Sequence, residues 1–227
     1  MNIAVILLSG KGTRLGSETP KQFILVNNRP IYIYSLHAFY YNKKIDKIIL
    51  VTNKEYVNDV KNDLKKYGYN KKEIEVISGG KERYLSVKCA VNALKSNKYN
   101  LDDNVLIHDG VRPNISQKII DQNISGLNLE PVALTAIKTS NDLPSERVDT
   151  IHFLNHQAYR AQTPQSFKLG ILRDIYDKAA SYNPYPFTDD VSLAIACNYP
   201  YIIVEGDESN YKITRQEDLE RFINERK

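Results

Sequence analysis

Short runs of apolar residues alternate along the chain with longer segments in which apolar residues recur every three or four positions. The short runs are typical of strands buried on both faces of a sheet, and the longer segments are typical of helices that cover those faces. The expected strands are Ile3–Leu8, Lys47–Val51, Glu73–Ile77, Asn104–Ile107, Val132–Ile137 and Tyr201–Val204. The expected helices are Ile31–Tyr41, Glu55–Tyr67, Glu82–Lys95, Gln117–Ile124 and Pro164–Ala180, then one that begins with Asp189 and one that follows Thr214. This alternation predicts an α/β fold with a mostly parallel central sheet.

Hydroxyl side chains mark the expected starts of the last three helices. Thr163 is placed to cap a helix whose first residue is Pro164, a position where proline loses no hydrogen bond. Thr188 is placed to cap the next helix. Thr214 with Glu217 three residues later has the spacing of a capping box, which predicts the start of the final helix.

The α/β pattern is interrupted between Thr139 and His156, where polar and turn-forming residues dominate. Within this stretch Val148–Leu154 has the composition of one strand of a hairpin. Such a segment would pack poorly as core. We therefore expect one domain over residues 1–227, with a β-arm that projects from it at about residues 139–156.

Composition narrows the class of protein. The chain has 227 residues, of which 42% are hydrophobic and 26% charged, as in ordinary globular proteins. A net charge of +4 is too small for a nucleic-acid-binding surface, and the longest apolar run, Ile3–Leu8, is far shorter than the roughly 20 residues that span a bilayer. Cys89 and Cys197 are expected to be reduced thiols. These features predict a cytoplasmic protein that binds neither nucleic acid nor membrane.

A glycine-rich loop follows the first strand, with the sequence Leu8-Ser9-Gly10-Lys11-Gly12-Thr13-Arg14-Leu15-Gly16. Glycines after a buried strand let backbone N–H groups approach phosphates closely. Lys11, Arg14 and Lys21 add three positive charges within eleven residues. This cluster suits a nucleoside triphosphate, which brings about four negative charges; a solvated basic loop is the alternative.

Two other phosphate-binding motifs fit this loop poorly. In a dinucleotide fold the third glycine would come one residue earlier, and an acidic residue would end the second strand, where this chain has Val51-Thr52-Asn53. The P-loop pattern G-x-x-x-x-G-K-[ST] is absent from the sequence. An NAD-dependent oxidoreductase therefore remains a remote alternative, and a non-catalytic nucleotide-binding protein is another.

Asp109 follows the expected strand Asn104–Ile107, at the edge of the sheet where open α/β folds place their ligands. A carboxylate there can hold Mg²⁺ against a triphosphate, since Mg²⁺ favours one or two carboxylates plus phosphate oxygens; the alternative is that it caps a turn. Arg112, three residues later, has the fork geometry that binds phosphate. His108 is expected to be a structural hydrogen-bonding residue and not a base.

Six motifs, in order along nearly the whole chain, resemble those of the methylerythritol-phosphate and ribitol-phosphate cytidylyltransferases. They are Leu8–Gly16 with Pro20-Lys21-Gln22-Phe23, Gly79–Arg83 with Ser86, His108–Pro113, Gln162–Phe167, Thr188-Asp189-Asp190 and Asn210–Thr214. The resemblance implies a Rossmann-like nucleotidyltransferase fold, CTP and Mg²⁺ at the site, and a homodimer with exchanged arms. It implies transfer of CMP from CTP to a polyol phosphate, giving a CDP-polyol and pyrophosphate.

The resemblance also implies roles for individual residues, grouped as catalytic, nucleotide-binding, acceptor-binding and metal-binding. The catalytic residues are Arg14, Lys21 and Lys212; the nucleotide-binding residues are Leu8, Ser9, Gly10, Lys11, Gly12, Thr13, Gly80, Lys81, Arg83 and Ser86; the acceptor-binding residues are Asp109, Arg112, Ser140, Asn155, Thr163 and Thr188; the metal ligand is Asp109. No general base is required, because the attacking phosphate monoester, whose second pKa is about 6, is already mostly dianionic at pH 7. Catalysis then consists of aligning two anions and cancelling their charge.

Four positions depart from the family pattern. Lys81 stands where the family usually has an acid, Thr139-Ser140 where it has Asp-Thr, and Asn155 where it has an arginine that reaches the partner subunit. Lys138, His156 or Arg160 are candidates to compensate for that arginine. Val111 resembles the ribitol-phosphate branch, so ribitol 5-phosphate is the expected acceptor. 2-C-methyl-D-erythritol 4-phosphate (MEP) is the alternative.

Overall fold

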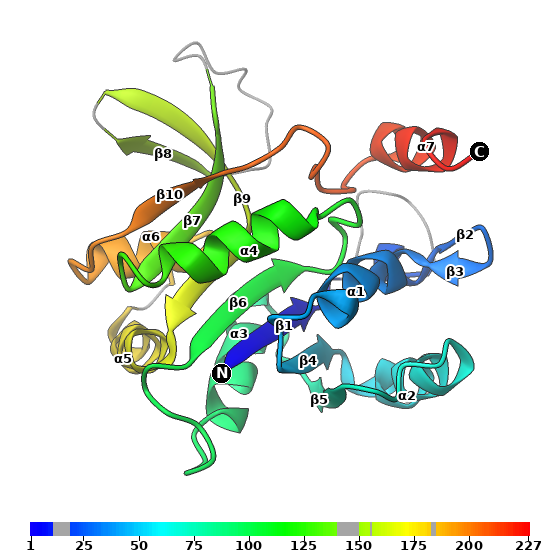
Figure 1. Cartoon of the computed structure of the whole chain (residues 1–227), viewed down its shortest axis with the longest axis horizontal. Coiled ribbons are helices and arrows are strands. Elements are labelled where there is room, and N and C mark those ends of the chain that lie inside the picture. Colours follow the sequence, from blue (N-terminus) through cyan, green and yellow to red (C-terminus); the bar gives the residue numbers. More distant parts are fainter. Residues whose placement is uncertain (11–18, 140–149, 155, 183–184) are drawn as a thin grey trace.

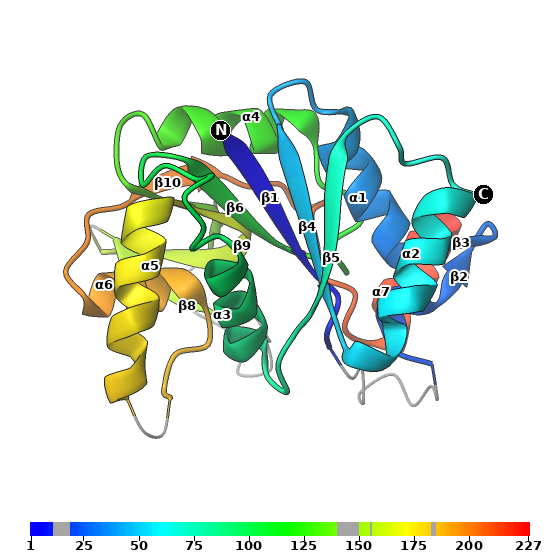
Figure 2. The same cartoon turned by 90° about the horizontal axis from the view of Figure 1, so that it is seen from below.

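The computed structural model describes residues 1–10, 19–139, 150–154, 156–182 and 185–227, which build a central sheet with helices on both faces (Figures 1 and 2). The strands of this sheet are, in spatial order, β10 (Ile202–Glu205), β7 (Val132–Lys138), β9 (Gln157–Lys168), β6 (Asn104–Asp109), β1 (Asn2–Leu7), β4 (Lys47–Thr52) and β5 (Glu73–Ser78). A short strand, β8 (Ile151–Leu154), pairs with β9, and β2 (Leu25–Val26) pairs with β3 (Arg29–Pro30) in a small separate ribbon. In the main sheet, every pair of neighbouring strands that does not include β9 is parallel, as the alternation of strands and helices predicted.

The helices divide between the two faces of the sheet because each strand alternates its side chains. Ile3, Val5 and Leu7 of β1 join one core, and Ala4 and Ile6 join the other. The first core is covered by α3 (Arg83–Ala93), α5 (Leu169–Lys178) and α6 (Asp190–Ala196). The second is covered by α1 (Ile31–Tyr41), α2 (Val57–Lys66) and α4 (Gln117–Gly126), while α7 (Gln216–Asn224) packs on a smaller cluster near β2. The described residues also form the short 3₁₀ turns η2 (Lys21–Phe23), η3 (Lys54–Tyr56) and η4 (Ala179–Ser181).

The helix expected over Pro164–Ala180 is wrong in its first part. Residues up to Lys168 belong to β9, which runs antiparallel between β6 and β7, and the helix begins at Leu169. Proline is tolerated within a sheet at irregular positions, and Pro164 lies where the register with β7 shifts between Leu134 and Ala136. Burial of the whole Ala161–Phe167 run favours pairing on both sides over a one-sided helix.

The expected capping residues are also corrected. Thr163 lies inside β9 and caps no helix. The N-cap of α6 is Asp189, whose Oδ1 accepts a hydrogen bond from Ser192 N at 2.7 Å, and not Thr188. At α7 the N-cap is Arg215 and the capping carboxylate is Asp218, not Glu217; it accepts from the backbone N–H groups of Thr214 and Arg215 at 2.8 Å each.

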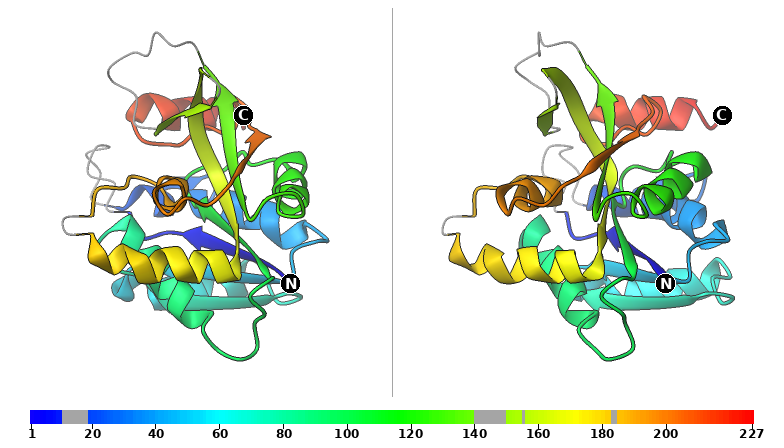
Figure 3. Two further views of the ribbon diagram at one scale, coloured as in Figure 1. Left: turned by 90° about the vertical axis from the view of Figure 1, so that its left-hand side faces the viewer. Right: turned by 60° about the vertical axis from the view of Figure 1, so that its left-hand side comes forward.

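The projecting arm is present in its described part. Strand β8 pairs antiparallel with the start of β9, and both extend beyond the body of the sheet together with the end of β7 (Figure 3). The Phe153 side chain on β8 is 63% exposed. Residues 140–149 lie outside the described part of the chain. None of the helices in the described ranges has the length and apolar character needed to cross a membrane.

Candidate active site

Asp109 is the last residue of β6, at the carboxyl ends of the parallel strands β1, β4 and β6. Figure 2 shows these three strands side by side. The neighbour of Asp109 on β1 is Leu7, after which the chain continues into Leu8 and Ser9. A Cβ atom at Gly110 would lie 2.4 Å from Leu8 Cδ2, so only glycine lets the two connections pack this closely. The structure therefore brings the start of the glycine-rich loop beside Asp109, as the sequence predicted.

Three cations surround this carboxylate. Lys212 Nζ lies 2.9 Å from Asp109 Oδ2, Arg83 Nε lies 3.5 Å from Oδ1, and Arg112 Nε lies 3.6 Å from Oδ2. Burial by itself would raise the pKa of Asp109, but the nearby charges of Lys212, Arg83 and Arg112 hold the pKa well below its usual range. Asp109 is therefore ionised throughout the neutral range.

Arg83 joins Asp109 to a second buried acid that the sequence motifs did not assign to the site. Arg83 Nη1 lies 2.7 Å from Asp190 Oδ2, and Tyr176 donates a hydrogen bond of 2.5 Å to the other oxygen of Asp190. Gln165 Oε1 accepts from the backbone N–H of Asp190 at 2.9 Å. Among the described residues Arg83 Nη2 has no hydrogen-bond partner although it is buried. A contact of Arg83 with the nucleotide stays a prediction.

A chain of hydrogen bonds behind Asp109 fixes its backbone. The Asp109 N–H donates to Thr163 Oγ1 at 3.1 Å, the Thr163 hydroxyl lies 3.0 Å from His108 Nδ1, and His108 Nε2 lies 3.1 Å from Arg112 O. Burial lowers the pKa of His108 to about 4, so the ring is neutral at pH 7. A neutral imidazole that donates from Nε2 and accepts at Nδ1 satisfies both bonds. His108 is thus structural, as expected, and Thr163 positions Asp109.

Ser86 is buried between the Gly79-Gly80 turn and the start of the glycine-rich loop. Its Oγ lies 2.7 Å from Ser9 Oγ and accepts a hydrogen bond of 3.2 Å from Gly80 N. A Cβ at Gly79 would lie 2.7 Å from Ser86 Oγ, and one at Gly80 would lie 2.2 Å from Leu85 Cβ, so the turn requires glycine at both positions. This close packing brings the second predicted nucleotide-binding motif against the first. Lys81 is exposed in the same turn and contacts none of the Asp109 cluster.

Gln22 anchors the segment that carries Lys21. Its side chain is buried and donates hydrogen bonds to Leu8 O and to Gly10 O, the latter at 2.9 Å. These bonds hold the η2 turn against the glycine-rich loop, which places the half-buried Lys21 next to that loop. The role of Gln22 was missed because its partners are backbone atoms that a motif does not reveal. Predicted residues Lys11, Gly12, Thr13 and Arg14 lie outside the described residues.

Four of the predicted acceptor-binding residues, Asp109, Arg112, Thr163 and Thr188, line one small cavity. This cavity, of about 50 Å³, is also lined by Lys212. Arg112 is buried and donates to the backbone through Nη1, so its role in the described residues is to support the cavity wall. Ser140 and Asn155, the other predicted acceptor contacts, lie outside the described residues.

The donor set at this edge is compatible with a magnesium ion. Within the described ranges no three His, Cys, Asp or Glu side chains cluster as a metal cage would require. Asp109 is instead a single ionised carboxylate beside the start of the glycine-rich loop, and Mg²⁺ takes few protein ligands when phosphate oxygens complete its shell. Asp109 is therefore the residue that would hold the ion.

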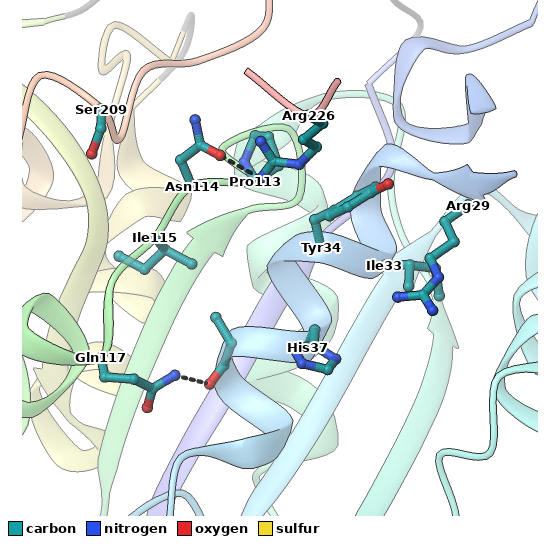
Figure 4. Close-up of a pocket in the computed structure, with 11 residues that line it drawn as sticks. Arg29, Ile33, Tyr34, His37, Pro113, Asn114, Ile115, Gln117, Ser209 and Arg226 are labelled. Atoms are coloured by element: carbon teal, nitrogen blue, oxygen red, sulfur yellow. Dashed lines mark hydrogen bonds between the residues drawn. The ribbon is translucent and has the colours of Figure 1, made fainter. Parts of the chain in front are cut away.

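A larger cavity, of about 580 Å³, lies on the other side of the connection between β6 and α4 (Figure 4). It is lined by side chains of α1 and of that connection, with Arg29, Ser209 and Arg226 at its rim. Arg226 is already bonded to Asn114 Oδ1 at 2.6 Å and lies over the Tyr34 ring. None of the sequence-predicted site residues that the structure describes lines this cavity.

The sheet order, the glycine-rich loop and the cation-ringed Asp109 define the class of protein as a nucleotidyltransferase. The family model of 2-C-methyl-D-erythritol 4-phosphate cytidylyltransferase (IspD) matches residues 2–223. The chain belongs to this family, and it is a CTP-using cytidylyltransferase.

Proteins of that name from two organisms illustrate the similarity. The chain is 36% identical over 221 residues to the one from Lachnoclostridium phytofermentans, covering 95% of this chain and 92% of the relative. It is 38% identical over 221 residues to the one from Thermosipho africanus, covering 96% and 95%.

Solved structures agree with the sequence relatives. The 4-diphosphocytidyl-2C-methyl-D-erythritol synthase of Anaerococcus prevotii superposes with a TM-score of 0.78 at 28% identity, covering 99% of this chain and 95% of the other. The 2-C-methyl-D-erythritol 4-phosphate cytidylyltransferase of Francisella tularensis gives 0.76 at 28% identity, covering 98% of each. The predicted family and the predicted fold are both confirmed.

Proposed function

We propose that this protein transfers CMP from CTP to MEP, releasing pyrophosphate. The family match and the names of the relatives support MEP as the acceptor, and none of the relatives described above carries a ribitol name. The expectation of ribitol 5-phosphate rested on Val111. That side chain is buried, 7% exposed, and packs with Ile213 and Phe222 under α7. Val111 is therefore a core side chain, and its packing gives no reason to prefer ribitol 5-phosphate.

The observation that carries the proposal is the Asp109 carboxylate with three cations within 3.6 Å at the ligand-binding edge of the sheet. In the reaction a phosphate oxygen of MEP forms a bond to the α-phosphorus of CTP, and the bond from that phosphorus to the pyrophosphate oxygen breaks. Lys212, and Lys21 with Arg14 from the glycine-rich segment, neutralise charge on the two reactants. Mg²⁺, held by Asp109, would supply further neutralisation of the triphosphate.

A pyrophosphate-release assay tests the acceptor directly. We expect release with CTP, Mg²⁺ and MEP together, and a kcat/KM for ribitol 5-phosphate lower by at least about 100-fold, since an acceptor site built for hydrogen bonds rejects a poor match strongly. UTP in place of CTP is the matched control for the base. A higher kcat/KM with ribitol 5-phosphate than with MEP would overturn the choice of acceptor.

We also propose that two copies of the chain associate through the arm at residues 139–156. Phe153 supports this by its position: it is a large apolar side chain, 63% exposed, on a strand that extends beyond the body of the sheet (Figure 3), where a second copy would cover it. The Phe153→Asp variant is expected to sediment as a monomer at concentrations where the parent is a dimer. Leu129→Asp, at a residue 72% exposed after α4 and away from the arm, should leave the dimer intact. A parent chain that sediments as a monomer contradicts this proposal.

A further inference from the structure

His152 joins the arm to the wall of the active-site cavity. It lies on β8, is 7% exposed, and its Nε2 is 2.9 Å from Asp189 Oδ2. Next to this contact, Thr150, the residue before β8, has its Oγ1 2.7 Å from Thr188 Oγ1. These two contacts tie β8 and the residue before it to the first turn of α6.

Asp189 has both carboxylate oxygens occupied. Oδ1 caps α6 by accepting from Ser192 N at 2.7 Å, and Oδ2 faces His152. Burial by itself would raise the pKa of Asp189, but the hydrogen bond and charge of His152 and the bonds from Ser192 bring the pKa down to about 2. The carboxylate is therefore ionised throughout the working range, and removing its partner would leave a buried charge that is only half satisfied.

The His152–Asp189 pair lies where it can affect binding of the acceptor. Thr150, Thr188 and Asp189 line the same cavity as Asp109 and Lys212. An anionic acceptor phosphate in this cavity would be repelled by an uncompensated Asp189 carboxylate. It would be favoured by the two threonine hydroxyls, whose directions depend on how β8 is held against α6.

We propose that His152 is a positioning residue for the acceptor: through its contact with Asp189 it fixes Thr150 and Thr188 in the cavity wall and screens the Asp189 charge from the acceptor phosphate. This inference rests on the proposed function, because it assigns the cavity to the acceptor. His152 itself touches no reacting atom. We expect a substitution of His152 to change binding of the acceptor and not binding of the nucleotide. The residues expected to bind the nucleotide, Ser9, Ser86 and Arg83, do not depend on β8.

The test compares His152→Leu, which removes the hydrogen-bond donor, with His152→Gln, which keeps one. For His152→Leu we expect the KM for MEP to rise by about 10-fold or more, while the KM for CTP and kcat stay within about 3-fold of the parent. His152→Gln should recover most of the acceptor affinity. The control is His37→Leu, at an exposed histidine of α1, which should leave both KM values unchanged.

A double-mutant cycle separates positioning from a general loss of stability. If His152 acts through Asp189, the His152→Leu/Asp189→Asn double variant should have a KM for MEP no higher than that of His152→Leu, because asparagine keeps the α6 cap but removes the uncompensated charge. Additive losses would overturn the proposed route. Equal rises in both KM values, or no rise in the KM for MEP, would overturn the role itself.

Hydrogen exchange gives a readout that needs no activity. In His152→Leu the amides of β8 should exchange at least about 10-fold faster than in the parent, with those of β1 unchanged, because the strand loses its link to α6. Unchanged β8 exchange would contradict the link. A parent that transfers no CMP to MEP would overturn the proposed function and the acceptor role, and the exchange result would still decide whether the link exists.

Discussion

The Asp109→Asn variant is expected to lose at least about 1,000-fold in kcat/KM for CTP, the largest effect of any substitution considered for this protein. Asparagine has the same shape but no charge. It therefore cannot hold a divalent cation against the triphosphate, and it leaves Lys212, Arg83 and Arg112 without the anion they share. The measurement is pyrophosphate release across a range of Mg²⁺ concentrations, normalised to the folded fraction.

A stability control is needed because Asp109 is buried among cations. We expect the free energy of unfolding to fall by about 1–3 kcal/mol, less than for a fully dry ion pair because the Lys212 and Arg83 side chains are about a quarter exposed. Asp177→Asn, at an exposed carboxylate of α5 paired with Lys95, is the matched substitution and should leave activity unchanged. An Asp109→Asn enzyme within 10-fold of the parent would mean that this carboxylate does not bind the metal.

Lys21→Ala should reduce kcat by about 100- to 1,000-fold while changing the free energy of unfolding by less than about 1 kcal/mol. The lysine lies on the η2 turn that Gln22 holds against the glycine-rich loop, so its charge is placed where the triphosphate is expected to bind. Single-turnover transfer from CTP measures the chemical step without product release.

The control for Lys21→Ala is Lys118→Ala. Lys118 is an exposed lysine of α4, 3.9 Å from Glu205, and it lies outside the Asp109 cluster. We expect it to retain the parental rate. A Lys21→Ala enzyme that turns over like the parent would refute charge neutralisation by this residue, whatever the effect of Asp109→Asn.

Most of the sheet could be predicted from the sequence because its parallel strands are continuous apolar runs. The β1 prediction differs from the observed bounds by one residue at each end, and the β4 prediction by one residue at its C-terminal end. Strand β9 could not be predicted, because Thr163-Pro164 has the appearance of a helix start and the strand is defined by its two neighbours, β6 and β7. The position of β9 between β6 and β7 is set by tertiary contacts, which local sequence propensity does not reveal.

The site could be predicted where a residue's role follows from its own motif, and not where it depends on a distant partner. Asp109, Arg83 and Lys212 come from three separate motifs, and the structure joins them. Asp190 and His152 take their roles from contacts with residues far along the chain, which no spacing rule reveals. The buried position of Val111 could not be predicted for the same reason, since it depends on contacts with Ile213 and Phe222.

A crystal structure with a non-hydrolysable CTP analogue and Mn²⁺ tests the central claim most directly, since the anomalous signal of manganese locates the metal. We predict the triphosphate between the glycine-rich loop and Lys212, the cytosine beside Ser86 and Arg83, and manganese bound to Asp109. A nucleotide seated in the larger cavity between α1 and the β6–α4 connection (Figure 4), or a metal bound away from Asp109, would contradict the account.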